Sequence, residues 1–145
     1  MNNLASLILV LALTKEPVPA FEKPYAPQRE LLVQAVLEES NNQPFAGKIA
    51  VAGVILDRTV DRRWPSTIRG VIFQPYQFSY VGKAGRHYFS PRDVRQARLA
   101  VLLARMGERP CGRVLAFHAT YIKRPKQWLT VKRKCRIADH IFYEG

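Results

Sequence analysis

Acidic residues are scarce in this chain of 145 residues, in which 11 Asp and Glu stand against 23 Lys and Arg, for a net charge of +12. Cysteine is scarcer, and neither Cys111 nor Cys135 has a Cys or His neighbour at the short spacing that a zinc site needs. The two cysteines are therefore either free buried thiols or, if the protein is exported, a Cys111–Cys135 disulfide. The three histidines form no metal-binding cluster in the sequence, so we expect neither a metal nor another cofactor.

Long hydrophobic runs are also missing. Residues 4–13 (LASLILVLAL) are too few to span a bilayer but have the length of a signal-peptide core. Val18–Ala20 adds small residues at the −3 and −1 positions of a cleavage site, although no Lys or Arg precedes the apolar run. We interpret residues 1–26 as an export signal or weak membrane anchor with a proline-rich tether, in preference to a first structural helix. Residues 27–145 are enough for one domain with its own core.

Charge is distributed unevenly along the chain. Residues 1–60 hold 5 basic and 6 acidic residues, whereas residues 61–145 hold 18 and 5. Such an excess predicts contact with an anionic polymer or surface, which could be nucleic acid, anionic lipid or a carboxylate-bearing cell wall. The sequence has no recognised reading helix, zinc spacing or glycine-rich RNA motif, so a nucleic-acid-binding protein stays only as an alternative.

Periodicity and capping signals predict helices first and a small sheet afterwards, which is an α+β, mostly helical domain. The clearest helix is 91–106, because Ser90 and Asp93 form a capping box at its start and Gly107 follows its end. Further helices are expected at 28–40 and 46–58, with a short one within 64–73 and a loop or small hairpin at 74–89. Two strand-like runs follow, at 113–122 and 136–143, separated by a basic connection that carries Trp128.

Two adjacent glutamates end the first predicted helix, whose apolar face is formed by Leu31, Leu32, Ala35 and Val36. Glu38 follows Glu30 and Gln34 at helical spacing on the polar side, so we expect a solvated charge at a helix end. Glu39 falls in the middle of the apolar face, where a carboxylate is costly unless it has a partner. It is then either part of a buried ion pair or hydrogen-bonded cap, or a carboxyl with a raised pKa that serves as a general acid.

A carboxyl that an apolar wall keeps protonated suits the acid of a glycosidase. Most glycosidases pair it with a second carboxylate, but the other acids of this chain have other expected roles. Asp57 lies beside Arg58 on a helix and Asp93 is a cap, which leaves Asp139 as the only reserve. A mechanism that uses one carboxyl group twice fits this inventory.

Four blocks of the sequence resemble, in order and spacing, the SleB-type cell wall hydrolases, a family that includes spore-cortex-lytic enzymes and phage-borne relatives. They are AVLEESNNQPFAGKIAVAGVILDR, WPSTIRGVIFQPYQFSYV, LAFHATYI and RIADHIFY, and together they span about residues 28 to 143. The resemblance implies a lysozyme-like, lytic transglycosylase-like single domain with a small antiparallel sheet and one catalytic glutamate. The family's E-A-R-G-E-P pattern places its first glutamate on Glu39 and its second on Gln43, a departure that favours a single-carboxylate mechanism.

The resemblance also implies a substrate, the β-1,4 bond between N-acetylmuramic acid and N-acetylglucosamine in peptidoglycan. Glu39 would donate a proton to the leaving oxygen and then remove one from the C6 hydroxyl, closing a 1,6-anhydro ring. A hydrolytic muramidase of the same fold is the alternative. The candidates for substrate binding, which could instead be packing residues, are Gln77, Phe78 and Ser79 of the Q-F-S tripeptide, His118 and Tyr121.

Peptidoglycan stem peptides carry free carboxylates, so the basic clusters at 123–126 and 132–136 are candidates for electrostatic adhesion, or else a solvated basic surface. We expect a monomer without a specific nucleic-acid partner, exported to the periplasm or cell wall. Two settings fit, a bacterial wall-remodelling enzyme and a phage lysis or virion-associated factor. A catalytically silent wall-binding module is a further alternative. His87 has no expected role, and His140 and Tyr143 are expected to be structural in preference to lying at the edge of the cleft.

Overall fold

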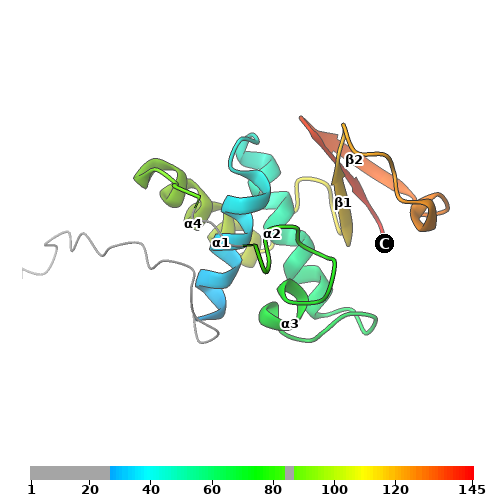
Figure 1. Ribbon diagram of the computed structural model, residues 1–145, viewed down its shortest axis with the longest axis horizontal. Coiled ribbons are helices and arrows are strands. Elements are labelled where there is room, and N and C mark those ends of the chain that lie inside the picture. Colours follow the sequence, from blue (N-terminus) through cyan, green and yellow to red (C-terminus); the bar gives the residue numbers. More distant parts are fainter. Residues whose placement is uncertain (1–26, 84–86) are drawn as a thin grey trace, which may run out of the picture.

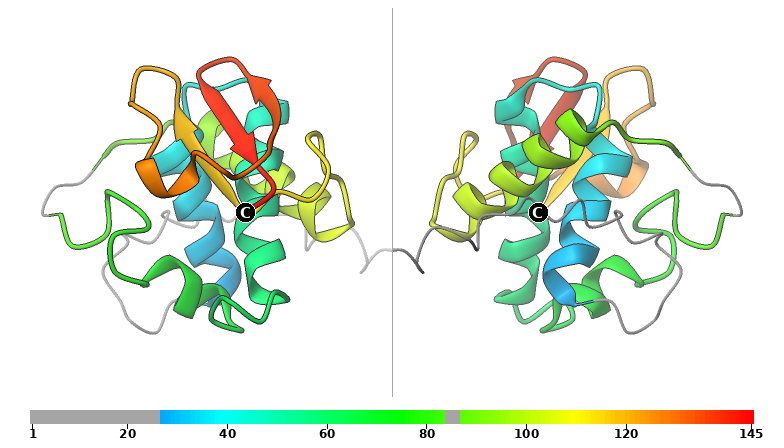
Figure 2. Two further views of the ribbon diagram at one scale, coloured as in Figure 1. Left: turned by 90° about the vertical axis from the view of Figure 1, so that its right-hand side faces the viewer. Right: turned by 90° about the vertical axis from the view of Figure 1, so that its left-hand side faces the viewer.

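The computed structural model describes residues 27–83 and 87–145, so the apolar segment and tether predicted for residues 1–26 lie outside the described part. In chain order the elements are α1 (Gln28–Ser40), α2 (Phe45–Thr59), α3 (Ile68–Ile72), α4 (Pro91–Arg105), β1 (Ala116–Ala119), the 3-10 helix η1 (Lys126–Trp128), β2 (Arg133–Ile137) and β3 (His140–Tyr143). Helices α1 and α2 lie between α4 on one side and the sheet on the other (Figure 1, Figure 2). The predicted order of helices followed by a small sheet is confirmed.

Helix α1 is central to the helical layer, because it packs against α2, α3 and α4. Its predicted apolar face is buried as expected, but Val33 and Leu37 on other sides of the helix are buried too. The helix is therefore surrounded rather than amphipathic. Helix α2 adds the apolar run from Ile49 to Ile55 to the core, and its small residues let α1 and α4 approach it.

The start of α4 is fixed by the capping box that the sequence predicted. The Ser90 hydroxyl accepts a hydrogen bond from the backbone N–H of Asp93 at 3.1 Å, and the Asp93 carboxylate accepts from the Ser90 backbone N–H at 2.9 Å. Both interactions satisfy N–H groups that a helix start leaves unpaired. Gly107, just past the end, has φ +102°, which favours glycine.

The sheet departs from the sequence-based prediction. Its strand order is β1-β3-β2 with both pairs antiparallel, and β2 is paired only with β3 within the described residues. The run 136–143, expected to be one strand, is divided by a turn in which Ala138 has a positive φ of 45°. No Asn-Gly or Gly-rich signal marks this turn, and part of the basic connection becomes β2. The run 113–122 contributes only the four residues of β1.

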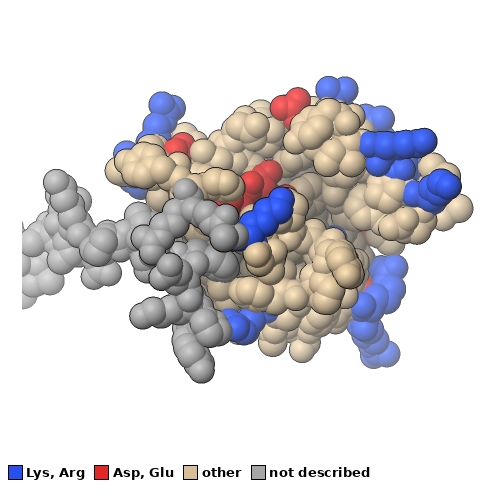
Figure 3. Space-filling model, viewed as in Figure 1, with Lys and Arg blue, Asp and Glu red and all other residues tan. Residues whose placement is uncertain are grey.

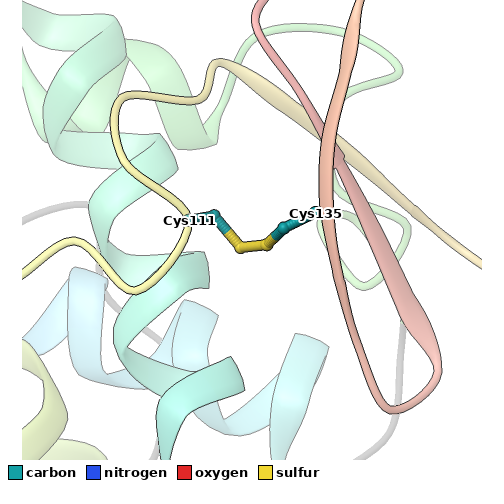
Figure 4. Close-up of a disulfide and its surroundings, with 2 residues drawn as sticks. All are labelled: Cys111 and Cys135. Carbon is teal, nitrogen blue, oxygen red and sulfur yellow. A yellow bond between two sulfur atoms is a disulfide. The ribbon is translucent and has the colours of Figure 1, made fainter.

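A disulfide joins Cys111, in the segment between α4 and β1, to Cys135 on β2 (Figure 4). The Cα atoms are 5.7 Å apart and the residues are separated by 24 positions. Of the two alternatives left by the sequence, the disulfide is therefore the correct one. It fastens the edge strand of the sheet to the segment that leads out of the helical layer.

Candidate active site

An open cleft of about 840 Å³ lies between the helical layer and the sheet. Its walls come from the C-terminal end of α1, residues 76–79 with His87 and Phe89, β1, η1 and the turn between β2 and β3. In the view of Figure 3 a group of Asp and Glu atoms lies near the centre of the face, whereas most Lys and Arg atoms lie around its periphery. All the predicted site residues line this cleft, namely Glu39, Gln77, Phe78, Ser79, His118 and Tyr121.

Glu39 lies in the last turn of α1 and is half-buried in the wall of the cleft. Burial, together with the negative charge of Glu38, raises the pKa of its carboxyl to about 7, and the positive charge of Lys83 opposes both effects. The helix geometry thus placed Glu39 correctly, facing inward. A carboxyl with this pKa is substantially protonated at neutral pH, so it can donate a proton to a group bound in the cleft.

Glu38 is not the solvated charge that the helix pattern predicted. Its side chain is only 9% exposed and lines the same cleft as Glu39. One carboxylate oxygen accepts from the Gln34 side-chain amide at 2.8 Å, and the other contacts Nδ1 of His87. The prediction was wrong because the polar side of α1 also has tertiary contacts, among them that of His87, which is 49 positions away in the chain. His87 therefore has a partner that the sequence did not reveal.

The end of α1 is held by a buried lysine. Lys48, on α2, is 2% exposed, and its ammonium group donates to the backbone carbonyls of Ser40 at 2.9 Å and of Asn41 and Gln43 at 2.7 Å. A cation is favourable at a helix C-terminus, where carbonyls lack partners. Burial lowers the pKa of Lys48. Sequence reasoning missed this residue, although a lysine within the otherwise apolar run of α2 was a usable signal.

A second buried cation supports the Q-F-S segment. Arg58 is 3% exposed, donates through Nε to the Leu115 carbonyl at 2.7 Å, and through Nη1 to the Gln77 side-chain carbonyl at 3.1 Å. Its guanidinium also lies 3.9 Å from the centroid of the Trp64 ring. Burial lowers the pKa of Arg58 to about 10. Because Arg58 engages the carbonyl end of Gln77, the other end of that carboxamide is a donor available to a ligand.

His118 is held in an aromatic group on the sheet side of the cleft. Its Nδ1 lies 2.8 Å from the Ala119 carbonyl, which can only accept, so Nδ1 carries the proton. In the neutral ring Nε2 then accepts from the Tyr143 hydroxyl at 2.9 Å. The His118 and Tyr143 rings stack with centroids 5.5 Å apart, and Trp128 packs on both. His118 thus offers the cleft a ring face rather than a base, and Tyr121, 84% exposed, stands at the rim.

Asp139, the reserve carboxylate, lies in the cleft and is hydrogen-bonded to Gln43. Two further acids are paired with arginines, and the partner of Asp57 is not the adjacent Arg58. Asp57 pairs with Arg109 at 3.0 Å, and Asp61 pairs with Arg113 at 2.8 Å and with Arg63 at 2.9 Å. Among the described residues, His, Cys, Asp and Glu form no group of three or more placed to hold a metal ion.

The fold and cleft define a class of small, mostly helical α+β domains that present a carboxyl of raised pKa to an open groove lined by amide and aromatic groups. Residues 42–143 match the sequence profile described as Cell Wall Hydrolase, and the chain belongs to this family. The resemblance seen in the four sequence blocks is therefore confirmed. No helix in 27–83 or 87–145 combines the length and apolar character needed to cross a bilayer.

Several known proteins are similar to this chain. The spore cortex-lytic enzyme of Bacillus subtilis (strain 168) is 38% identical over 115 residues, which are 79% of this chain and 36% of that protein. A spore cortex-lytic enzyme of Bacillus cereus is 36% identical over 113 residues, which are 78% of this chain and 42% of that protein. The chain thus spans roughly two-fifths of the length of the curated relatives it matches.

Two solved structures share the fold. The catalytic domain of the Bacillus cereus SleB protein superposes with a TM-score of 0.71 at 35% identity, covering 80% of this chain and 88% of that one. The catalytic domain of the germination-specific lytic transglycosylase SleB from Bacillus anthracis gives 0.68 at 30% identity, covering 84% and 98%. The expected fold class, a mostly helical α+β domain with a small antiparallel sheet, is confirmed by these similarities.

Proposed function

We propose that the protein is a lytic transglycosylase that cleaves the β-1,4 bond between N-acetylmuramic acid and N-acetylglucosamine in peptidoglycan. The observation that carries this proposal is the carboxyl of Glu39, half-buried in the cleft wall with its pKa raised to about 7. The proposal is supported by the names of the relatives, which are spore cortex-lytic enzymes and, in one solved structure, a lytic transglycosylase. The disulfide supports work outside the reducing cytoplasm, in the periplasm or cell wall.

The reaction uses one carboxyl twice. Protonated Glu39 donates its proton to the glycosidic oxygen as the bond to the muramic acid C1 breaks and an oxocarbenium-like state forms. Ionised Glu39 then takes the proton from the C6 hydroxyl, whose oxygen bonds to C1 and closes the 1,6-anhydro ring. Protons and bonds balance without water, and Glu39 returns to its starting state. The substrate's own N-acetyl group stabilises the cation.

The other cleft residues bind the glycan. The amide nitrogen end of Gln77, oriented by Arg58, donates to an acetamido carbonyl. The His118 and Trp128 rings provide a face on which a sugar packs, and Tyr121 covers it from the rim. Ser79 is exposed at the cleft and adds a hydroxyl, whereas Phe78 is 5% exposed and forms the wall beneath it.

Digestion of purified sacculi, with mass spectrometry of the soluble products, tests the proposal. Anhydro-muropeptides are expected from the wild type and none from Glu39→Gln. Glu38→Gln, which removes the adjacent charge, is expected to retain most of the activity, and Glu108→Gln is the matched control on an exposed residue outside the cleft. Absence of any released product, or loss of activity in Glu38→Gln with retention in Glu39→Gln, would overturn the assignment.

A hydrolytic muramidase is the second candidate, because Asp139 places another carboxylate in the cleft. Such an enzyme would release products with reducing muramic acid ends, and it would depend on the carboxylate of Asp139 to activate water. The same mass spectra distinguish the two reactions, since the anhydro product is lighter by one water. Reducing ends alone would replace the transglycosylase proposal with the hydrolytic one.

A further inference from the structure

We propose that the side chains of Gln43 and Asp139 form a latch that joins the two walls of the cleft and so positions Glu39 against the sugar-binding wall. This inference rests on the proposed function of the same site. The Gln43 amide nitrogen donates to the Asp139 carboxylate at 3.3 Å, and its carbonyl oxygen accepts from the Asp139 backbone N–H at 3.1 Å. Gln43 is 6% exposed, and the two residues are separated by 96 positions.

Each partner of the latch is fixed to one wall. The Gln43 backbone N–H donates to the Ser40 carbonyl at 2.9 Å, and its carbonyl accepts from Lys48 at 2.7 Å, so Gln43 moves with the end of α1 that carries Glu39. On the other side, the Asp139 carbonyl accepts from the Thr120 backbone N–H at 2.7 Å. Thr120 lies between β1, with His118, and the exposed Tyr121. The latch is therefore a direct side-chain connection between the acid and the glycan-binding wall.

The latch needs an amide at position 43. A carboxamide can donate to a carboxylate and accept from an N–H at the same time, whereas an ionised glutamate has no proton to donate. A glutamate at this position would face the Asp139 carboxylate at hydrogen-bonding distance, and two such carboxylates cannot both stay ionised without cost. The glutamine that departs from the family's E-A-R-G-E-P pattern is thus matched to Asp139 in this chain.

The experiment compares Gln43→Glu, the exchanged pair Gln43→Glu/Asp139→Asn, and Gln96→Glu, which adds a charge on α4 outside the cleft. In the exchanged pair the amide introduced at position 139 donates to the carboxylate introduced at position 43, so the latch is rebuilt with the donor on the other side. Initial rates on sacculi are measured at pH 5.0 to 8.0, and the midpoint of the alkaline limb is determined for each variant separately, because a new carboxylate in the cleft would raise the pKa of Glu39. The charged and titratable groups around the latch are unchanged in all variants. Lys48 donates to the Gln43 carbonyl, Arg136 donates to the carbonyl of Ala138 beside Asp139, and His140 interacts electrostatically with Asp139. Glu38, Glu39 and His118 line the same cleft.

We expect Gln43→Glu to lose about tenfold in kcat/KM at pH 7.5, mainly through KM, in line with the loss of one hydrogen bond to a charged group. The loss should shrink as pH falls, because two carboxyls at hydrogen-bonding distance bind a shared proton that can restore the hydrogen bond. The exchanged pair should recover to within about threefold of wild type, since the hydrogen bond is restored. Thermal unfolding is the second readout, and the midpoint of Gln43→Glu should fall at pH 7.5 and recover in the exchanged pair.

Rates for Gln43→Glu equal to those of Gln96→Glu, or an exchanged pair no better than Gln43→Glu, would overturn the latch. If Gln43→Glu does not fold, the exchanged pair is compared with wild type alone. An exchanged pair that does not recover to within about threefold of the wild-type rate would then overturn the latch. If wild-type protein releases no product, the proposed function fails independently. The latch is then tested by binding of the same variants to sacculi in a sedimentation assay, with the same order of affinities expected.

Discussion

The carboxyl of Glu39 is affected in the same direction by its burial and by the charge of Glu38, and both raise its pKa to a final value of about 7. The proton that the first step requires is therefore present below about pH 7 and absent above it. Burial makes the acid usable at neutral pH, and the adjacent glutamate adjusts the value. At this scale the chemistry is decided by two neighbouring side chains with different roles.

The first prediction concerns the pH dependence of cleavage. Activity on sacculi should fall as pH rises above about 7, because Glu39 ionises. Glu38→Gln removes the repulsion that favours the protonated form, so the alkaline limb of its profile should move to lower pH. Initial rates from pH 5 to 9 measure both. A limb that stays in place or moves upward in Glu38→Gln would exclude the electrostatic role of Glu38.

The same carboxyl makes stability depend on pH. The pKa is about 7 in the folded protein against 4.5 for an unperturbed glutamate, so the folded state binds the proton more tightly. Ionisation of Glu39 has no effect on the free energy of unfolding below pH 4.5. From there the free energy of unfolding falls as pH rises, and above pH 7 the loss reaches its full value of up to about 3 kcal/mol. Thermal unfolding of wild type and Glu39→Gln at pH 5 and pH 8 should show the variant gaining relative stability at pH 8. An equal difference at the two pH values would contradict the raised pKa.

At the scale of elements, the site depends on how α1 ends. Three backbone carbonyls in the α1–α2 turn converge on one ammonium group, that of Lys48. This arrangement terminates the helix without a glycine and fixes the direction in which Glu39 and Gln43 point. The sequence in this turn, ESNNQP, therefore acts together with a lysine one turn into the following helix.

Lys48→Met tests this arrangement. The variant keeps an unbranched side chain, one atom shorter, but leaves the carbonyls of Ser40, Asn41 and Gln43 without their donor. We expect the free energy of unfolding to fall by about 2–4 kcal/mol, since buried acceptors lose a charged partner. Urea denaturation measures the change, and Lys123→Met, on an exposed residue, is the matched control. Equal stability of the two variants would show that the carbonyls find other partners.

The disulfide gives a second prediction about elements. It closes a loop of 24 residues that contains β1, η1 and the start of β2. A loop of this size predicts a loss of about 3 kcal/mol in the Cys111→Ala/Cys135→Ala variant. Its unfolding midpoint should match that of wild-type protein in the presence of a thiol reductant. A midpoint unchanged by either treatment would mean that the packing of β2 against β3 suffices to hold the sheet.

At the scale of the whole molecule, most Lys and Arg atoms in the view of Figure 3 lie around the periphery, and one group lies directly beside the central Asp and Glu atoms. Lys123 and Arg133 are exposed, in the segment after β1 and on the edge strand β2. Lys134, by contrast, pairs with Glu144 at 3.2 Å. The basic surface beside the cleft is suited to attract an anionic polymer toward it, and its contribution should decrease as salt shortens the reach of exposed charges.

The prediction for this surface is a binding measurement on Glu39→Gln protein, which does not consume the sacculi. Binding should weaken as NaCl rises from 50 to 500 mM, in proportion to the number of charges engaged. Lys123→Ser/Arg133→Ser should bind several-fold more weakly at low salt than Arg92→Ser/Arg95→Ser, which removes the same charge from exposed positions on α4. Equal weakening by the two double variants would show that binding depends on net charge and not on this basic surface. Binding that does not change with salt would exclude an electrostatic role for the surface.

The sequence by itself determined the helices and the direction of Glu39. Periodicity and caps are interactions between residues three or four positions apart, so Ser90, Asp93 and Gly107 could be recognised without a fold, as could the inward position of Glu39. The Q-F-S tripeptide, His118 and Tyr121 were placed in one cleft only with the help of the family resemblance, because nothing local joins them.

The tertiary structure alone decided the environment of the acid. Glu38 is covered because α1 is packed on several sides, and the positions of Lys48, Arg58 and His87 relative to the cleft follow from contacts between separate elements. The β2–β3 turn and the Gln43–Asp139 pair, 96 positions apart, have no signature within a short window of sequence. The inward position of Glu39 was local information, whereas the pKa of its carboxyl depends on residues that only folding brings together.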